Sequence, residues 1–118
     1  YFNAGFITYS NLSKKSLLGV SERTLESVGA VSEEVAKEMA LGAIIKANSD
    51  FAVSITGIAG PGGSNTKPEG LVCFGFASKT NYETKLINFG KIGRDEVRKN
   101  SCLEALSCLI RYIEYEDL

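Results

Sequence analysis

The chain has 118 residues, which is enough for one domain around a single hydrophobic core. Apolar residues make up 44% of it and charged residues 23%, an ordinary globular composition that argues against disorder, collagen and coiled coil. The 13 basic and 14 acidic residues leave a net charge of −1, so no basic surplus exists to bind nucleic acid. Histidine is absent, which excludes Ser-His-Asp and Cys-His catalysis and HExxH metal sites within these residues.

The apolar runs are too short to span a bilayer, so we expect no membrane partner. The three cysteines, Cys73, Cys102 and Cys108, are odd in number and contain no CxxC pair. They predict small buried thiols in a reducing compartment and hence a cytoplasmic protein, with a disulfide or a metal site as the less favoured alternative. We therefore expect neither a metal ion nor another cofactor.

The first half of the chain predicts one strand and three helices. Residues 5–9 form an apolar, β-branched and aromatic run typical of a short buried strand. A short helix over residues 12–18 follows, ended by Gly19, and Ser21 caps a second that runs through residue 28. Ser32, followed by two glutamates, begins a longer helix that ends at residues 48–50. The small side chains of this helix, at Ala36, Ala40 and Ala43, predict close packing on a neighbouring element.

The second half predicts a sheet and a long helix. Residues 51–56 and the near-continuous apolar run 71–77 indicate buried strands, and residues 82–89 indicate a more exposed hairpin partner. Glycines and both prolines of the chain fill residues 57–70, so this segment predicts a loop. From residue 94 an amphipathic helix runs to about residue 112. We expect its apolar stripe to consist of Val97, Cys102, Ala105, Leu106, Leu109, Ile110 and Ile113.

This order of elements predicts an α/β fold: a single layered domain in which a small mixed sheet packs with helices, with a long C-terminal helix. The connection from the strand at 5–9 through the helices to the strand at 51–56 favours a parallel crossover. The later hairpin adds an antiparallel part.

Three places in the sequence are candidates for chemistry. The first is the carboxyl end of the strand at 51–56, where Ser54 and Thr56 lead into the glycine-rich loop; ligands bind at such strand ends in open α/β sheets. The alternative, a flexible surface loop, is about equally favoured. The second is Lys14, one turn into the helix after the hydroxyl-rich end of the first predicted strand. Lysine becomes a base when burial lowers its pKa, although a lone lysine on a short helix is more often a solvated charge.

The third candidate is the pair Arg94 and Arg98, four residues apart near the start of the long helix. Two guanidinium groups on one helical face suit a phosphate or a carboxylate. The alternative is a pair of surface arginines partnered by Asp95 and Glu96 of the same turn, which we favour on the residues alone.

Together these segments resemble a known family. The matching strings are YF and GFITYSN in residues 1–11, LGV at 18–20, GAVSE at 29–33, ITGIAGPGG at 55–63, KP at 67–68, and the segment from Gly93-Arg94 through Arg98. In this order they are similar to the CinA C-terminal domain family, whose activity is nicotinamide-mononucleotide amidohydrolase. The resemblance covers nearly all of residues 1–118.

The resemblance implies cleavage of the carboxamide of nicotinamide mononucleotide by a serine nucleophile and a lysine base, which yields nicotinic-acid mononucleotide and ammonia. Such a pair needs no histidine. Lys14 matches the family lysine, Tyr9 the tyrosine beside it, and Thr56 the threonine that positions amide and nucleophile. Arg94 or Arg98 would meet the phosphate. The loop that would line the substrate pocket is Gly57, Ile58, Ala59, Gly60, Pro61, Gly62 and Gly63.

The resemblance departs from the family at the nucleophile. The family serine lies in an Ala-Glu-Ser-Cys-Thr-Gly-Gly-like segment that precedes the part matching Tyr1, and no serine here matches it; Ser10 and Ser54 match other family positions. We therefore expect a domain that lacks its N-terminal segment. Three interpretations remain: part of an enzyme, a non-catalytic remnant that binds a nucleotide or a partner, and, less favoured, a structural interaction module. The resemblance also implies a homo-oligomer, a dimer or higher, and a truncated edge would favour such association.

Overall fold

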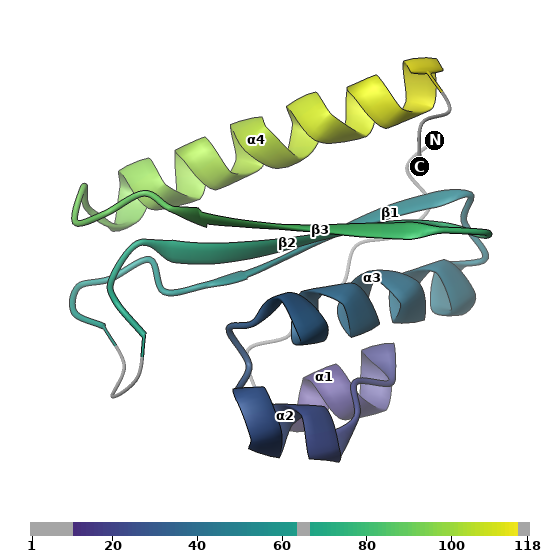
Figure 1. Ribbon diagram of the computed structural model, residues 1–118, viewed down its shortest axis with the longest axis horizontal. Helices are drawn as coiled ribbons and strands as arrows, with labels where there is room; N and C mark the ends of the chain where they lie inside the picture. Colours follow the sequence, from purple (N-terminus) through teal and green to yellow (C-terminus); the bar gives the residue numbers. More distant parts are fainter. Residues whose placement is uncertain (1–10, 64–66, 116–118) are drawn as a thin grey trace.

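The computed structural model describes residues 11–63 and 67–115, which fold into three layers with a sheet in the middle (Figure 1). One layer is α4 (Arg94–Tyr115), which crosses one face of the sheet formed by β1 (Phe51–Gly57), β2 (Leu71–Ser78) and β3 (Tyr82–Asn88). The other face is covered by α3 (Glu33–Ala47), with α1 (Asn11–Leu18) and α2 (Glu22–Val28) outside it. The predicted α/β architecture with its long C-terminal helix is confirmed.

The described strands form an antiparallel sheet in the order β1–β2–β3. Thr56 at the end of β1 lies opposite Cys73 of β2, and Phe74 of β2 lies opposite Lys85 of β3. The predicted hairpin is therefore confirmed. The parallel part of the predicted mixed sheet depends on residues 5–9, which lie outside the described residues.

Polar side chains cap the helices where the sequence predicts it. The Ser21 hydroxyl accepts from the backbone N–H of Thr24 at 3.4 Å, and the Ser32 hydroxyl accepts from that of Val35 at 3.2 Å. Asn48 ends α3 in the left-handed conformation with φ 49°, which asparagine tolerates better than most residues. These caps fix the entry and exit of the helices that flank the site.

The core on the α4 side of the sheet is aromatic. Phe74 and Phe76 of β2 are fully buried with ring centroids 6.3 Å apart, and Tyr112 of α4 meets the Phe76 ring edge-on at 5.2 Å. β2 is buried along almost its whole length, as predicted for a central strand, because helices cover both of its faces.

On the opposite face, α3 approaches the sheet unusually closely. A Cβ built on Gly75 would lie 2.2 Å from the backbone oxygen of Ala36, so only glycine fits there. The Ser54 hydroxyl donates to the same carbonyl oxygen at 2.5 Å. Ala36 and Ala40 are fully buried, which confirms the close packing predicted from the alanines of this helix.

The predicted apolar stripe of α4 is wrong in part. Val97 and Ala105 are buried, but the helix rests on the sheet through a face that also contains Ser101, Cys108 and Tyr112. The small side chains of Ser101 and Ala105 let the helix approach the strands, and the larger Leu103, Leu106 and Ile110 are turned away from the sheet. These three residues are 54%, 55% and 55% exposed.

The cysteine prediction is corrected at one position. Cys73 and Cys108 are buried free thiols as expected, whereas Cys102 is exposed. Over residues 11–63 and 67–115, no group of three or more histidine, cysteine or acidic side chains is arranged to hold a metal. The helices of the same residues include none that is long and apolar enough to cross a membrane.

Candidate functional site

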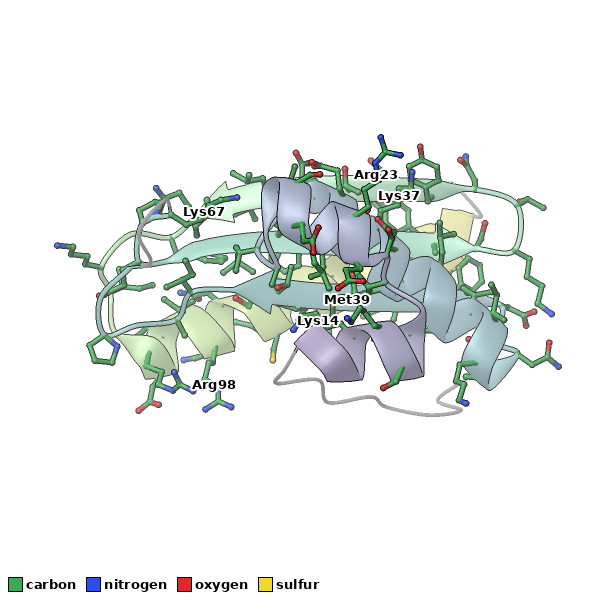
Figure 2. The ribbon with its side chains drawn as sticks, turned by 90° about the horizontal axis from the view of Figure 1, so that it is seen from below. Lys14, Arg23, Lys37, Met39, Lys67 and Arg98 are labelled. Atoms are coloured by element: carbon green, nitrogen blue, oxygen red, sulfur yellow. The ribbon has the colours of Figure 1, made fainter. Side chains whose placement is uncertain are left out.

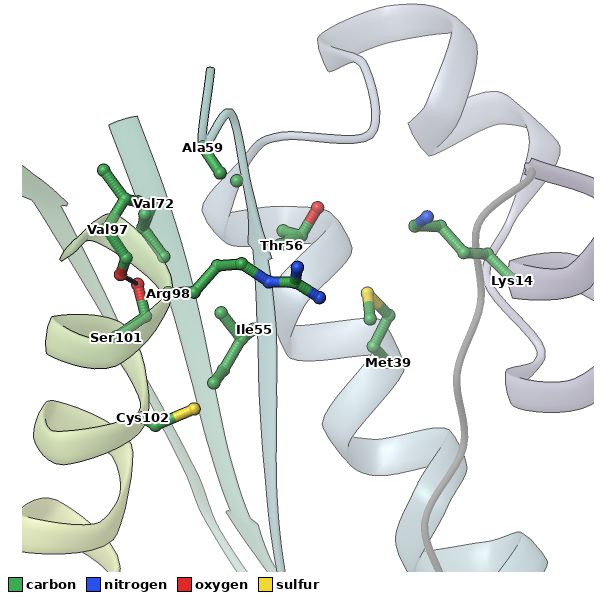
Figure 3. Close-up of a pocket in the computed structure, with 11 residues that line it drawn as sticks. Lys14, Met39, Ile55, Thr56, Ala59, Val72, Val97, Arg98, Ser101 and Cys102 are labelled. Atoms are coloured by element: carbon green, nitrogen blue, oxygen red, sulfur yellow. Dashed lines mark hydrogen bonds between the residues drawn. The ribbon is translucent and has the colours of Figure 1, made fainter. Parts of the chain in front are cut away.

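A cavity of about 410 Å³ opens between α1, α3, α4 and the end of β1 (Figure 3). Its size lies within the range of small-ligand sites. The structure brings together five of the residues singled out from the sequence, although they lie on four separate segments. These are Lys14, Thr56, Gly57, Ala59 and Arg98.

Lys14 enters this cavity from α1. Its side chain extends toward Met39 on α3, as Figures 2 and 3 show, and toward Thr56 on β1 (Figure 3). Only 7% of the residue is exposed, and burial lowers the pKa of its ammonium group below the usual value because the charged form loses solvation. The alternative of a solvated surface lysine therefore does not hold. A lysine with a lowered pKa loses its proton more readily and suits a general base.

Thr56 is the second-last residue of β1, just before the glycine-rich loop, and is 8% exposed. Its hydroxyl donates a hydrogen bond of 2.8 Å to the backbone carbonyl of Ala30, in the connection between α2 and α3. This bond ties the end of β1 to the segment that leads into α3. It also fixes the direction of the threonine side chain within the cavity wall.

The two predicted arginines lie in different surroundings. Arg98 lines the cavity, and its guanidinium extends over Ile55 toward the space between Thr56 and Met39 (Figure 3). Arg94 instead donates from Nη1 to the backbone oxygen of Gly60 at 3.1 Å. Arg98 thus supplies positive charge at the cavity, while Arg94 fastens the glycine-rich loop to α4; a contact of Arg94 with substrate remains a prediction.

Hydrogen bonds shape the described part of the glycine-rich loop. The N–H of Ile58 donates to the carbonyl of Leu71 at 2.9 Å, and the Glu69 carboxylate accepts from the N–H of Gly62 at 2.5 Å. Gly57 and Ala59 line the cavity, whereas Pro61, Gly62 and Gly63 are exposed and are not among its lining residues. A role for the outer loop in binding remains a prediction, and Tyr9 lies outside the described residues.

The Lys67 side chain links this loop to the Ala30 segment. Its ammonium donates to the backbone oxygen of Val31 at 2.7 Å, one residue after the carbonyl that accepts from Thr56. The Lys67-Pro68 string of the sequence therefore has a structural use: it ties the loop after β1 to the α2–α3 connection.

Sequence reasoning missed six residues of the cavity wall, which lie on two strands and two helices. The helical spacing of three and four residues from Arg98 was a signal for two of them, because it places side chains on the same face. The Ser101 hydroxyl donates within the helix to the carbonyl of Val97 at 2.6 Å. The added residues are Met39, Ile55, Val72, Val97, Ser101 and Cys102.

Comparison with known proteins gives a family and several relatives. The family model described as "CinA C-terminal domain" matches residues 1–113. "Nicotinamide-nucleotide amidohydrolase PncC" of Enterobacter agglomerans is 62% identical over 80 residues, which are 67% of this chain and 49% of that protein. A "putative competence-damage inducible protein" of Caldanaerobacter subterraneus subsp. tengcongensis is 50% identical over 96% of this chain and 27% of its own length. The chain thus spans half or less of these relatives.

Solved structures agree with the sequence relatives. The competence/damage inducible protein CihA from Agrobacterium tumefaciens superposes with a TM-score of 0.86 at 44% identity, over 91% of this chain and 66% of that one. A CinA superfamily protein from Escherichia coli gives 0.86 at 37% identity, over 90% and 62%.

Proposed function

Because the chain belongs to the CinA C-terminal domain family, we propose that it forms the lysine- and substrate-bearing part of an amidohydrolase acting on nicotinamide mononucleotide. The products are nicotinic-acid mononucleotide and ammonia. The observation that carries the proposal is the buried Lys14, with its lowered pKa, on the wall of the cavity that also includes Thr56 and Arg98. The amidohydrolase name of the 62% identical relative supports the reaction class.

In the proposed reaction the nucleophile is a serine from the segment that the family places before Tyr1. Its oxygen bonds to the carboxamide carbon while Lys14 Nζ takes the hydroxyl proton. The C–N bond then breaks, and Lys14 returns the proton to the departing nitrogen, which leaves as ammonia. Water hydrolyses the resulting ester, with Lys14 now accepting a proton from the water and returning it to the serine oxygen. Lys14 carries one proton in each half of the reaction, and none is lost.

Arg98 and Thr56 orient the substrate in this proposal. The Arg98 guanidinium matches a phosphate in charge and in its fork of donors, which would hold the nucleotide end. Thr56 lies with Lys14 on the cavity wall and meets the carboxamide. Positioning of this kind supplies a large share of the rate in enzymes that join a fixed nucleophile to a fixed carbonyl.

The proposal is tested by ammonia release from nicotinamide mononucleotide, with the chain alone and with a longer polypeptide that includes the family's serine segment. We expect turnover only from the longer form. In it, Lys14→Ala should lower kcat by roughly 10²- to 10⁴-fold, the usual contribution of a positioned general base. Lys15→Ala is the matched control, because Lys15 neighbours Lys14 on α1 and its amine lies 3.6 Å from the Glu22 carboxylate at the surface. Turnover unaffected by Lys14→Ala would refute the assignment.

The second candidate function is nucleotide binding without catalysis. It is favoured by one observation: no serine of this sequence matches the nucleophile segment of the family. The two functions differ in the longer polypeptide, because a remnant would bind nicotinamide mononucleotide and release no ammonia.

A further inference from the structure

The hydrogen bond of Thr56 restricts what this residue can offer a ligand. A carbonyl oxygen has no proton, so in the 2.8 Å contact with the Ala30 carbonyl the threonine must be the donor. A hydroxyl has a single proton and two lone pairs. With the proton directed at Ala30, Thr56 presents only lone pairs to the cavity that it lines.

The acceptor of this bond is held in place from both sides. The Ser32 hydroxyl donates to the Gly29 carbonyl at 2.9 Å, and the Lys67 ammonium donates to the Val31 carbonyl at 2.7 Å. The carbonyl between them, at Ala30, is therefore kept facing the end of β1. Thr56 itself is only 8% exposed, and turning its hydroxyl away would leave the part-buried Ala30 carbonyl without this donor.

From this polarity we infer that Thr56 distinguishes the carboxamide substrate from the carboxylate product, an inference that rests on the proposed function. A carboxamide carries N–H donors that can bond to the lone pairs of Thr56. An ionised carboxylate offers acceptors only, so it places oxygen lone pairs against oxygen lone pairs. Thr56 thereby holds the amide before cleavage and disfavours the acid after it, which speeds release of the product.

Lys14 acts in the opposite sense and sets the conditions of the test. Its ammonium form attracts a carboxylate, so it favours the acid whenever it is protonated. The ratio of the two affinities in the unmodified chain therefore combines both residues. A change in that ratio between variants measured at one pH reports on Thr56 alone.

The test measures the Kd of nicotinamide mononucleotide and of nicotinic-acid mononucleotide by calorimetry. The variants are Thr56→Val, which keeps the shape and removes the hydroxyl, and Thr56→Ser, which keeps the hydroxyl. Ser54→Ala is the matched control, because Ser54 also donates from β1 to a backbone carbonyl, that of Ala36, but does not line the cavity. Circular dichroism establishes that each variant is folded.

We expect Thr56→Val to shift the ratio of affinities toward the acid by about tenfold or more, the usual consequence of losing a hydrogen bond in a site built to make it. Thr56→Ser and Ser54→Ala should leave the ratio unchanged. An unchanged ratio in folded Thr56→Val overturns the inference while leaving the proposed function intact, as does an equal shift in Ser54→Ala. Failure of the unmodified chain to bind either nucleotide overturns the proposed function, and the inference falls with it.

Discussion

Thiol labelling provides a direct test of the cavity. The structure divides the three cysteines into two classes: Cys73 and Cys108 are 0% and 4% exposed, whereas Cys102 is exposed and lines the cavity. Burial also raises the pKa of the Cys73 and Cys108 thiols, which reduces the reactive thiolate form. We expect iodoacetamide to modify Cys102 rapidly and the other two only when the chain opens.

The size of the difference follows from the stability of a small domain. If a buried thiol reacts only from the unfolded state, an unfolding free energy of about 5 kcal/mol slows it by roughly 10³- to 10⁴-fold relative to an exposed thiol. The raised pKa values of Cys73 and Cys108 add little to this factor for labelling from the unfolded state, where burial no longer acts. A native-state difference of three orders of magnitude is therefore the expectation.

The assay follows each cysteine-containing peptide by mass spectrometry, with Cys102→Ser as the control that should remove the rapid phase. Nicotinamide mononucleotide at ten times its Kd leaves about one site in eleven free, so it should slow labelling of Cys102 roughly tenfold by simple mass action. Rapid labelling of Cys73 would refute the burial argument. Unslowed labelling of Cys102 at a nucleotide concentration that calorimetry shows to be saturating would place the ligand outside this cavity.

Three further predictions concern charge, packing and association. Because burial lowers the pKa of Lys14, the folded chain binds fewer protons than the unfolded chain just below pH 10.5. The free energy of unfolding therefore rises with pH in that range. Urea titrations at several pH values should show this rise, and Lys14→Met should remove it. Gly75→Ala places a Cβ 2.2 Å from the Ala36 oxygen and should cost about 1–3 kcal/mol, seen as a lower melting temperature by calorimetry. The exposed apolar row of α4 consists of Leu103, Leu106 and Ile110. Antiparallel pairing of two copies along this row would bury it and set Lys99 of one helix opposite Glu114 of the other, so we expect a dimer in sedimentation. Replacement of the row by glutamine should dissociate the dimer, and a monomeric unmodified chain would contradict the prediction.

Local signals were sufficient to predict the elements of the described fold. Ser21 and Ser32 mark helix starts because their hydroxyls satisfy backbone N–H groups, and the apolar run of β2 marks a strand covered on both faces. The orientation of α4 was not predictable in the same way. Apolar residues extend around more than one side of that helix, and periodicity alone does not tell which side meets a sheet when Ser101 and Ala105 permit the closer approach.

Some polar side chains of the candidate site were singled out from the sequence, whereas six residues of the cavity wall and the partners of the polar groups were not. Strand ends and a helix after a strand are recognisable in sequence, so Thr56 and Lys14 were found although β1 and α1 are distant along the chain. The partners of the polar side chains were not predictable, because they are backbone carbonyls, which every residue has. Thr56 donates to Ala30, and Arg94 donates to Gly60.

The contacts with backbone carbonyls separate two classes of polar residue at the site: those that hold the cavity wall in shape and those that face a ligand. Arg94 commits donors to the glycine-rich loop, and Lys67 ties that loop to the α2–α3 connection, so both hold the cavity wall in shape. Thr56 belongs to both classes: its proton stabilises the fold and its lone pairs face the cavity. Removing the hydroxyl from a residue with this double use changes stability and selectivity together. The paired comparison of Thr56→Val with Ser54→Ala separates the two effects, since Ser54 makes the same kind of bond to Ala36 away from the cavity.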